Sequence, residues 1–144
     1  MSERKNKPFS KVFALKNLLW LILAPLLLLA GCRSAENNHL QPEDFANYLK
    51  RANLKVDNVR PVLPDPFRAT SAVAILIDGS EIGVYKYDRN ARVQADRIRR
   101  LEETGCTYIN GVPYPVAVRG SFMLFGLDKS PKKKEILEVF NRFD

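Results

Sequence analysis

The first 31 residues decide how much of this 144-residue chain is available to form a folded domain. Residues 1–17 contain five Lys and Arg residues against one Glu, and the thirteen residues 18–30 that follow carry no charge. A basic segment, an apolar segment of about 7–15 residues and small residues at its end are typical of a secretory signal peptide. A membrane-spanning helix needs about 20 apolar residues, whereas this run is shorter and contains Pro25. We therefore predict that 1–31 is a signal peptide.

The end of the apolar run, Leu29-Ala30-Gly31-Cys32, resembles the lipobox of bacterial lipoproteins. In that family the cysteine thiol receives a diacylglycerol, the peptide is cut before the cysteine, and the new amino group is often acylated. The resemblance implies that fatty acids such as palmitate on Cys32 anchor the protein in a membrane, because two or more acyl chains give stable anchoring. The alternative is an uncleaved N-terminal anchor with an unmodified Cys32. In that family an Asp directly after the cysteine favours retention at the inner membrane. This chain has Arg33 at that position, which favours the outer membrane if the cell has one.

Most of the positive charge belongs to the leader. It holds five of the 23 Lys and Arg residues and one of the 16 acidic residues, so residues 32–144 keep a formal net charge of +3 instead of +7. A nucleic-acid-binding domain needs positive charge clustered on one face, and this modest charge on an exported chain argues against a nucleic-acid partner. What remains is enough chain for one domain. It is too short for a two-domain dinucleotide enzyme, a (β/α)₈ barrel or a kinase.

The rest of the chain alternates between helical and strand-like patterns. Residues 33–41 are polar and without periodicity, which predicts a flexible tether ahead of a single domain at 42–144. Apolar residues spaced three and four apart predict helices, and short apolar runs bounded by turn residues predict strands. Helices are expected over 42–52, 90–104 and from Pro131 after a cap at Ser130, and strands over 55–63, 72–77, 81–87, 106–109, 112–118 and 121–127.

Two dipeptides indicate how the strands pair. Asp78-Gly79 and Asn110-Gly111 each lie between two expected strands, and such dipeptides favour two-residue hairpins and hence antiparallel pairing. Pro61 places the first strand at a sheet edge, and Gly105 ends the middle helix. The predicted fold is therefore α+β, with two layers. A mostly antiparallel sheet has its helices packed on one face, in the approximate order α-β-β-β-α-β-β-(β)-α.

Few residues of the mature chain are suited to catalysis or metal binding. His39 is the one histidine, and it lies in the expected tether. Cys106 is the one thiol left if Cys32 is lipidated, so we expect it to fill space in the core, although a reactive or intermolecular role stays open. No zinc-protease, phosphate-loop or EF-hand motif is present. The sequence thus predicts a protein that is not an enzyme, with no cofactor and no metal.

Two sets of residues are candidates for an interaction surface. Tyr85 and Tyr87 share one strand face, which would be a binding platform if no helix covered it. The alternative is that they are half-buried sheet aromatics, like Tyr108 and Tyr114. Lys132, Lys133 and Lys134 lie at an expected helix start, where positive charge opposes the helix dipole. They could contact anionic lipid headgroups or an acidic partner, or they could simply make the surface more soluble.

Two further segments resemble small bacterial lipoproteins of no assigned function, loosely over residues 45–143. One is Ile82-Gly83-Val84-Tyr85-Lys86-Tyr87-Asp88 ahead of a helix, and the other is Pro115 followed by Arg119-Gly120-Ser121-Phe122-Met123-Leu124. The chain has Ser121 where that family has Asn, and it lacks a Trp before the Pro. The resemblance implies an envelope location and an α+β domain, and it supplies no catalytic residue.

These observations favour a membrane-anchored binding or interaction module at the cell envelope, with its domain outside the cytoplasm and an envelope protein as its expected partner. One alternative is an inhibitor or accessory subunit of an envelope protein, which a protruding loop at 64–71 would favour. Another is a small envelope hydrolase. That enzyme would need a cleft where carboxylates or Cys106 converge with shifted pKa values.

Overall fold

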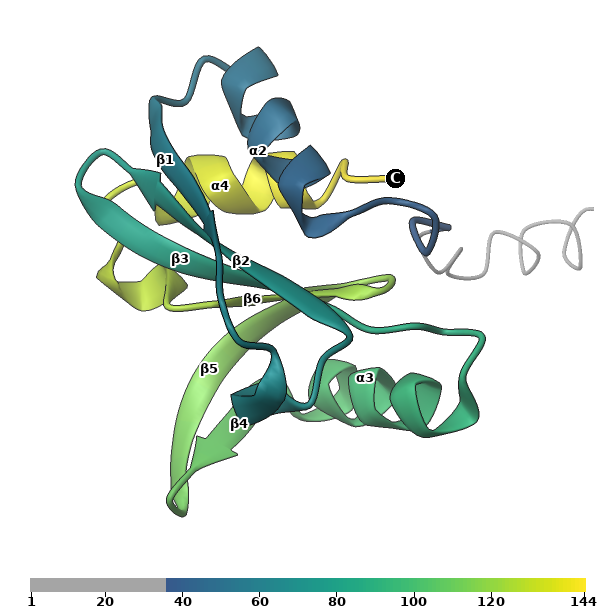
Figure 1. Ribbon diagram of the computed structural model, residues 1–144. Helices are drawn as coiled ribbons and strands as arrows, with labels where there is room; N and C mark the ends of the chain where they lie inside the picture. Colours follow the sequence, from purple (N-terminus) through teal and green to yellow (C-terminus); the bar gives the residue numbers. More distant parts are fainter. Residues whose placement is uncertain (1–35) are drawn as a thin grey trace, which may run out of the picture. The chain divides into compact units, whose positions relative to one another are not determined.

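The computed structural model describes residues 36–144, in which six strands form one antiparallel sheet in the order β1-β2-β3-β6-β5-β4 (Figure 1). The predicted α+β class and the approximate order of elements are confirmed. The elements are α2 (Pro42–Arg51), β1 (Val56–Pro61), η1 (Asp65–Phe67), β2 (Ser71–Ile77), β3 (Ser80–Lys86), α3 (Arg92–Thr104), β4 (Cys106–Ile109), β5 (Val112–Arg119), β6 (Phe122–Phe125), η2 (Leu127–Lys129) and α4 (Lys133–Phe140). No helix among these residues is long and apolar enough to cross a membrane.

Both predicted tight hairpins are present, and their backbone angles explain the residues chosen. The β2–β3 turn places Asp78 at φ 46° and Gly79 at φ 77°, and the β4–β5 turn places Asn110 at φ 51° and Gly111 at φ 80°. A two-residue turn with positive φ at both positions matches the right-handed twist of its strands, and Asn, Asp and Gly adopt it at low cost. The expected edge position of β1 is confirmed as well.

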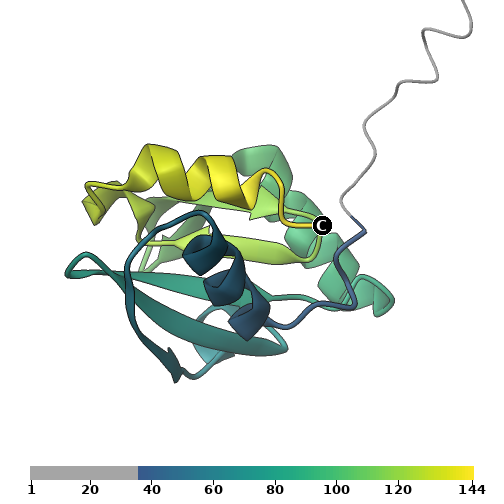
Figure 2. The same ribbon diagram turned by 90° about the horizontal axis from the view of Figure 1, so that it is seen from above.

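Helices cover both faces of the sheet, so the prediction of helices on one face is wrong for α3. On the first face α2 and α4 lie side by side (Figure 2), and they pack on β2, β3 and β6. On the second face Ile98 of α3 packs with Met123. The cause is visible in β6, where Phe122 and Leu124 face one core and Met123 faces the other. A strand that is apolar on both faces needs cover on both.

The segment before α2 is part of the domain, which corrects the prediction of a flexible tether through residue 41. Asn37 is fully buried. Its amide nitrogen donates to the carbonyl oxygens of Phe143 at 2.9 Å and Arg119 at 3.3 Å, and its oxygen accepts from the Ser121 N–H at 2.8 Å. This one side chain therefore ties the start of the domain to its C-terminal end and to the β5–β6 turn. His39 lies exposed in the same segment.

The last helix begins later than the sequence predicts. α4 starts at Lys133, and η2 and a turn precede it. The expected cap at Ser130 is wrong, because the N-cap residue is Lys132 and no side chain caps the helix. Ser130 instead stabilises the preceding turn, where its hydroxyl oxygen accepts from the Lys132 N–H at 3.2 Å and its carbonyl oxygen accepts from the Lys133 N–H. The three lysines thus occupy the entry to the helix and its first turn. The buried side of α4 is formed by Ile136, Val139 and Phe140, as its periodicity predicts.

Candidate functional site

Tyr85 and Tyr87 do not form an exposed platform, because both side chains are buried. The 3₁₀ turn η1 covers them. The Tyr87 hydroxyl donates to the carbonyl oxygen of Phe67 at 3.0 Å, and the Phe67 ring lies edge-on to Tyr85 with 4.6 Å between centroids. Burial raises the pKa of both tyrosines above the ordinary value. The structure therefore supports the alternative role, in which these tyrosines are core aromatics of the sheet.

The lysine cluster at the start of α4 is partly neutralised. Lys132 forms an ion pair with Glu135 at 3.3 Å, and Lys133 pairs with Asp128. The pKa of Glu135 is lowered, first by its own backbone N–H and then by Lys132. Among the ion pairs of residues 36–144, Lys134 has no partner. The cluster stays an exposed basic site, but most of its charge is balanced locally. Contact with lipid headgroups or an acidic partner stays a prediction.

The described part of the chain contains no group of three His, Cys, Asp or Glu side chains that could hold a metal ion. Two carboxyl groups in this region have shifted pKa values, and both shifts are downward. The pKa of Asp88 is lowered mainly by the Asn90 N–H and then by the Asn38 amide, and that of Glu135 is lowered as described above. A general acid at neutral pH needs a raised pKa, so these two carboxylates are poorly suited to that role. Cys32 lies outside the described residues.

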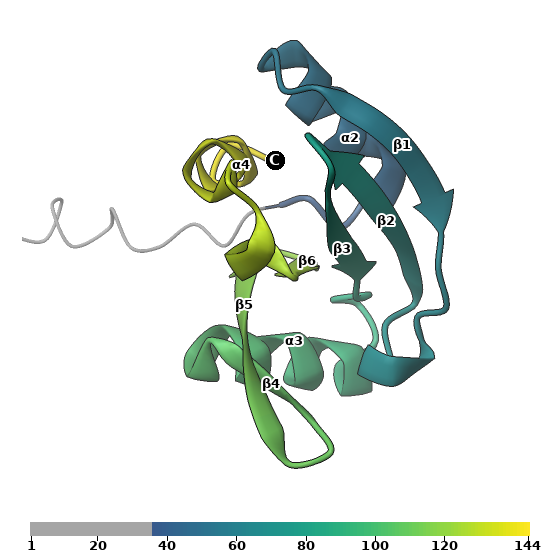
Figure 3. The same ribbon diagram turned by 90° about the vertical axis from the view of Figure 1, so that its left-hand side faces the viewer.

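The β4–β5 hairpin carries more exposed large hydrophobic side chains than any other element of the described domain. Five large hydrophobic side chains of the described domain are exposed: Leu63 (74%), Val93 (69%), Tyr108 (66%), Val112 (50%) and Tyr114 (39%). The last three belong to this one hairpin, and Figures 1 and 3 show its tip extending past α3. Tyr114 is also braced from within, because its ring lies 5.9 Å from that of Phe125. The hairpin is therefore a supported projection with an apolar surface.

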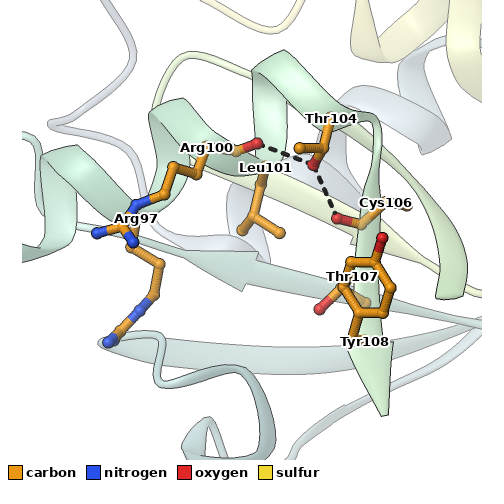
Figure 4. A pocket seen from close by; sticks show the side chains of 7 residues that line it. All are labelled: Arg97, Arg100, Leu101, Thr104, Cys106, Thr107 and Tyr108. Carbon is orange, nitrogen blue, oxygen red and sulfur yellow. Dashed lines mark hydrogen bonds between the residues drawn. The ribbon is translucent and has the colours of Figure 1, made fainter. Parts of the chain in front are cut away.

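A groove of about 320 Å³ separates this hairpin from α3 (Figure 4). Arg97, Arg100, Leu101 and Thr104 line it from the helix, and Cys106, Thr107 and Tyr108 line it from β4. The Thr104 hydroxyl lies 2.9 Å from the Arg100 carbonyl oxygen and 3.1 Å from that of Cys106, so it fixes the junction of helix and strand. The groove thus has one wall on a helix and the other on a sheet edge.

The charged residues of the groove are two arginines without a carboxylate partner. Arg97 donates to the Arg68 carbonyl oxygen at 3.2 Å, and Arg100 donates to the Asp96 carbonyl oxygen at 3.3 Å. Neither takes part in an ion pair of the described region, whereas the neighbouring Arg99 pairs with both Asp96 and Glu103. On the side of the groove the positive charge is left uncompensated.

Cys106 lies half-buried in the strand wall of this groove. The neighbouring Cys106 thiol raises the pKa of Tyr108 above its ordinary value. Sequence reasoning placed Tyr108 and Tyr114 among strand aromatics but did not single out the hairpin. The sequence signal that could have pointed to this hairpin is Val112-Pro113-Tyr114-Pro115, where prolines alternate with large side chains next to an Asn-Gly turn.

Comparison with known proteins finds no protein family, no curated protein and no solved structure that matches this chain. The resemblance to small bacterial lipoproteins therefore stays a prediction.

Proposed function

We propose that this protein is an interaction module held at the cell envelope by lipid on Cys32, and that it binds an envelope protein through a hairpin surface. The hairpin surface comprises the exposed side chains on the two faces of the hairpin, Tyr108 on one face and Val112 and Tyr114 on the other. It also includes the groove arginines Arg97 and Arg100. The observation that carries the proposal is the concentration of three of the five exposed large hydrophobic side chains on one projecting hairpin.

The composition of this surface suits protein recognition. Tyr and Arg are enriched at protein interfaces, because each combines apolar area with directional hydrogen bonding. The hairpin surface also has a fixed backbone, since the Asn110-Gly111 turn holds the strands in register and Tyr114 packs on Phe125. A preorganised surface loses less conformational entropy on binding. The small size of the domain fits a protein that works by binding.

The membrane anchor is tested by removing its cysteine. Because a thioether requires the thiol, we expect Cys32→Ser to abolish labelling by radioactive palmitate and to release the protein from the membrane fraction. Cys106→Ser serves as the matched control, because it removes the other cysteine without touching the lipobox. Absence of palmitate from the unmodified protein would refute the anchor.

The hairpin surface is tested by photo-crosslinking in intact cells. A photoreactive amino acid introduced at Tyr108 should yield a discrete adduct with an envelope protein. The same amino acid introduced at Leu63 should yield none, although Leu63 is the more exposed position at 74% against 66%. Equal adducts from both positions, or none from Tyr108, would contradict the proposal.

An inhibitory or accessory role remains the second candidate, and it would use the same surface. The loop at 64–71 that sequence analysis associated with this role is folded against the domain, since Phe67 is buried. The hairpin is instead the projecting element. Once the adduct of Tyr108 identifies the partner, the two roles separate by assay. An inhibitor lowers the activity of that partner, whereas a binding module changes only its location.

A further inference from the structure

We infer that the outer edge of β4 binds an extended acidic segment of the partner by strand addition, with its carboxylates directed to Arg97 and Arg100. This inference rests on the proposed function and specifies the chemistry of its partner. An exposed strand edge offers unpaired backbone groups to another chain, and peptides use such edges as docking sites. Strand β4 is the last strand of the sheet, with α3 across the groove from it.

The register of the hairpin shows which backbone groups face outward. The N–H of Val116 donates to the carbonyl oxygen of Gly105 at 3.0 Å, so these two residues form a hydrogen-bonded pair. Hydrogen-bonded and non-hydrogen-bonded pairs alternate along antiparallel strands. Cys106↔Pro115 and Tyr108↔Pro113 are therefore non-hydrogen-bonded pairs, and the N–H and C=O groups of Cys106 and Tyr108 point away from β5 toward the groove.

The two edges of this hairpin differ in what they offer. Pro113 and Pro115 occupy the positions of β5 whose nitrogens face outward, and proline has no N–H to donate. β5 pairs with β6 only from Val116 onward, so the outer edge of residues 112–115 is free. The two prolines close this free edge to strand addition. On β4 the N–H groups of Cys106 and Tyr108 remain. The Cys106 carbonyl oxygen is partly engaged by the Thr104 hydroxyl, so Tyr108 offers the complete donor and acceptor pair.

Charge identifies the kind of strand that fits. Neighbouring strands lie about 4.8 Å apart, so a strand added to β4 runs along the groove, and its alternate side chains point toward α3. Arg97 and Arg100 line this side of the groove and have no carboxylate partners. Guanidinium groups bind carboxylates with strong, paired hydrogen bonds. An extended segment with Asp or Glu at alternate positions satisfies both the strand edge and the arginines.

A second copy of this chain is a poorer occupant of the same groove. Pairing β4 with β4 would bring the sequence Cys106-Thr107-Tyr108-Ile109 into the groove, and neither this strand nor β5 contains an acidic residue. Both copies would then leave their arginines uncompensated. Self-association is therefore an outcome that the experiment must distinguish from peptide binding.

The test selects binders from a displayed library of random 12-residue peptides, using the full protein in detergent micelles. We expect enriched peptides to combine β-branched residues with acidic ones at alternate positions. On binding of a synthetic enriched peptide, hydrogen exchange at the Cys106 and Tyr108 amides should slow by at least tenfold, while the Ile109 amide, already bonded within the hairpin, should change little. Replacing Glu by Gln in the peptide should weaken binding roughly tenfold, because charge-assisted hydrogen bonds are lost.

Two pairs of variants separate the backbone from the side chains. Tyr108→Pro removes the outward N–H at a position that already faces Pro113, so the hairpin bonds are kept, whereas Tyr108→Ala keeps the N–H. We expect Tyr108→Pro to bind several-fold more weakly than Tyr108→Ala. Arg100→Gln should weaken the acidic peptide about tenfold and leave its Gln version unaffected, and Arg99→Gln is the control outside the groove.

Several results would overturn strand addition. These are a selection without enriched acidic sequences, unprotected Cys106 and Tyr108 amides, and equal binding by the two Tyr108 variants. Light scattering that shows a dimer broken by Tyr108→Pro would assign the edge to a second copy. Because the exchange measurement uses the unmodified protein, a variant that fails to fold does not affect it. If Tyr108 crosslinks to a protein in cells while these tests fail, the interaction module stands and strand addition does not.

Discussion

At the scale of single residues, Asn37 holds together three parts of the chain that are distant in sequence. Its side chain makes three hydrogen bonds while fully buried, and these reach the β5–β6 turn and the residues after α4. Nothing in the pattern of residues 33–41 distinguishes this asparagine from its polar neighbours. Hydrophobic periodicity reports which apolar residues are buried, and it says nothing of a polar residue that is buried because its partners happen to meet there.

We expect Asn37→Ala to lower the free energy of unfolding by about 1–3 kcal/mol, because it leaves the Ser121 N–H buried without a partner and removes one of the two donors to the Phe143 carbonyl oxygen. His39→Ala is the matched control, two residues away and exposed, and should change stability by less than about 0.5 kcal/mol. Urea unfolding followed by circular dichroism measures both variants. Equal stability of the two would mean that 36–41 is a tether after all.

At the scale of elements, local chemistry made the hairpins predictable. Asp78-Gly79 and Asn110-Gly111 restrict the backbone to one turn type, and the turn then sets the strand register on each side. The face covered by α3 was not predictable in this way. Ile98 is its one buried residue, and that single contact does not reveal which side of the sheet the helix covers. Likewise, period two placed Tyr85 and Tyr87 on one face but could not show that η1 would cover it.

The turn of the β4–β5 hairpin can be weakened without touching its surface. Gly111 has φ 80° and no heavy atom within 4 Å of an added Cβ, so Gly111→Ala is penalised by backbone conformation alone. We expect a loss of about 1–2 kcal/mol in unfolding free energy, together with weaker crosslinking from Tyr108. Gly79→Ala is the matched control, because Gly79 has φ 77° and equal space in the β2–β3 turn.

Gly79→Ala should lower stability by a similar amount and leave the crosslinking yield unchanged, since the β2–β3 turn is distant in sequence from the proposed surface. The comparison separates general loss of stability from local loss of the hairpin. If both variants reduce crosslinking equally, the adduct depends on the stability of the whole domain, and the hairpin has no particular role.

At the scale of the whole molecule, the ends of the domain lie opposite the proposed surface. The bonds of Asn37 hold the start of the domain beside its C-terminal end, and Figures 1 and 3 show the tip of the β4–β5 hairpin at the far side of the sheet. Because the domain begins by Asn37, the link to Cys32 is shorter than the sequence predicted. Five residue steps span at most roughly 17 Å in extended chain.

With Cys32 lipidated, this short link should hold the start of the domain near the membrane and present the hairpin outward. We expect a fluorophore attached through His39→Cys to transfer energy to labelled lipid headgroups more efficiently than one attached through Val112→Cys, both in a Cys106→Ser background and in reconstituted vesicles. Inserting about 15 Gly and Ser residues between Arg33 and Ser34 should reduce this difference, because a flexible link of that length lets the domain turn over. Equal energy transfer from the two positions without the insertion would mean that the domain already tumbles freely at the membrane. The short link would then not orient the hairpin.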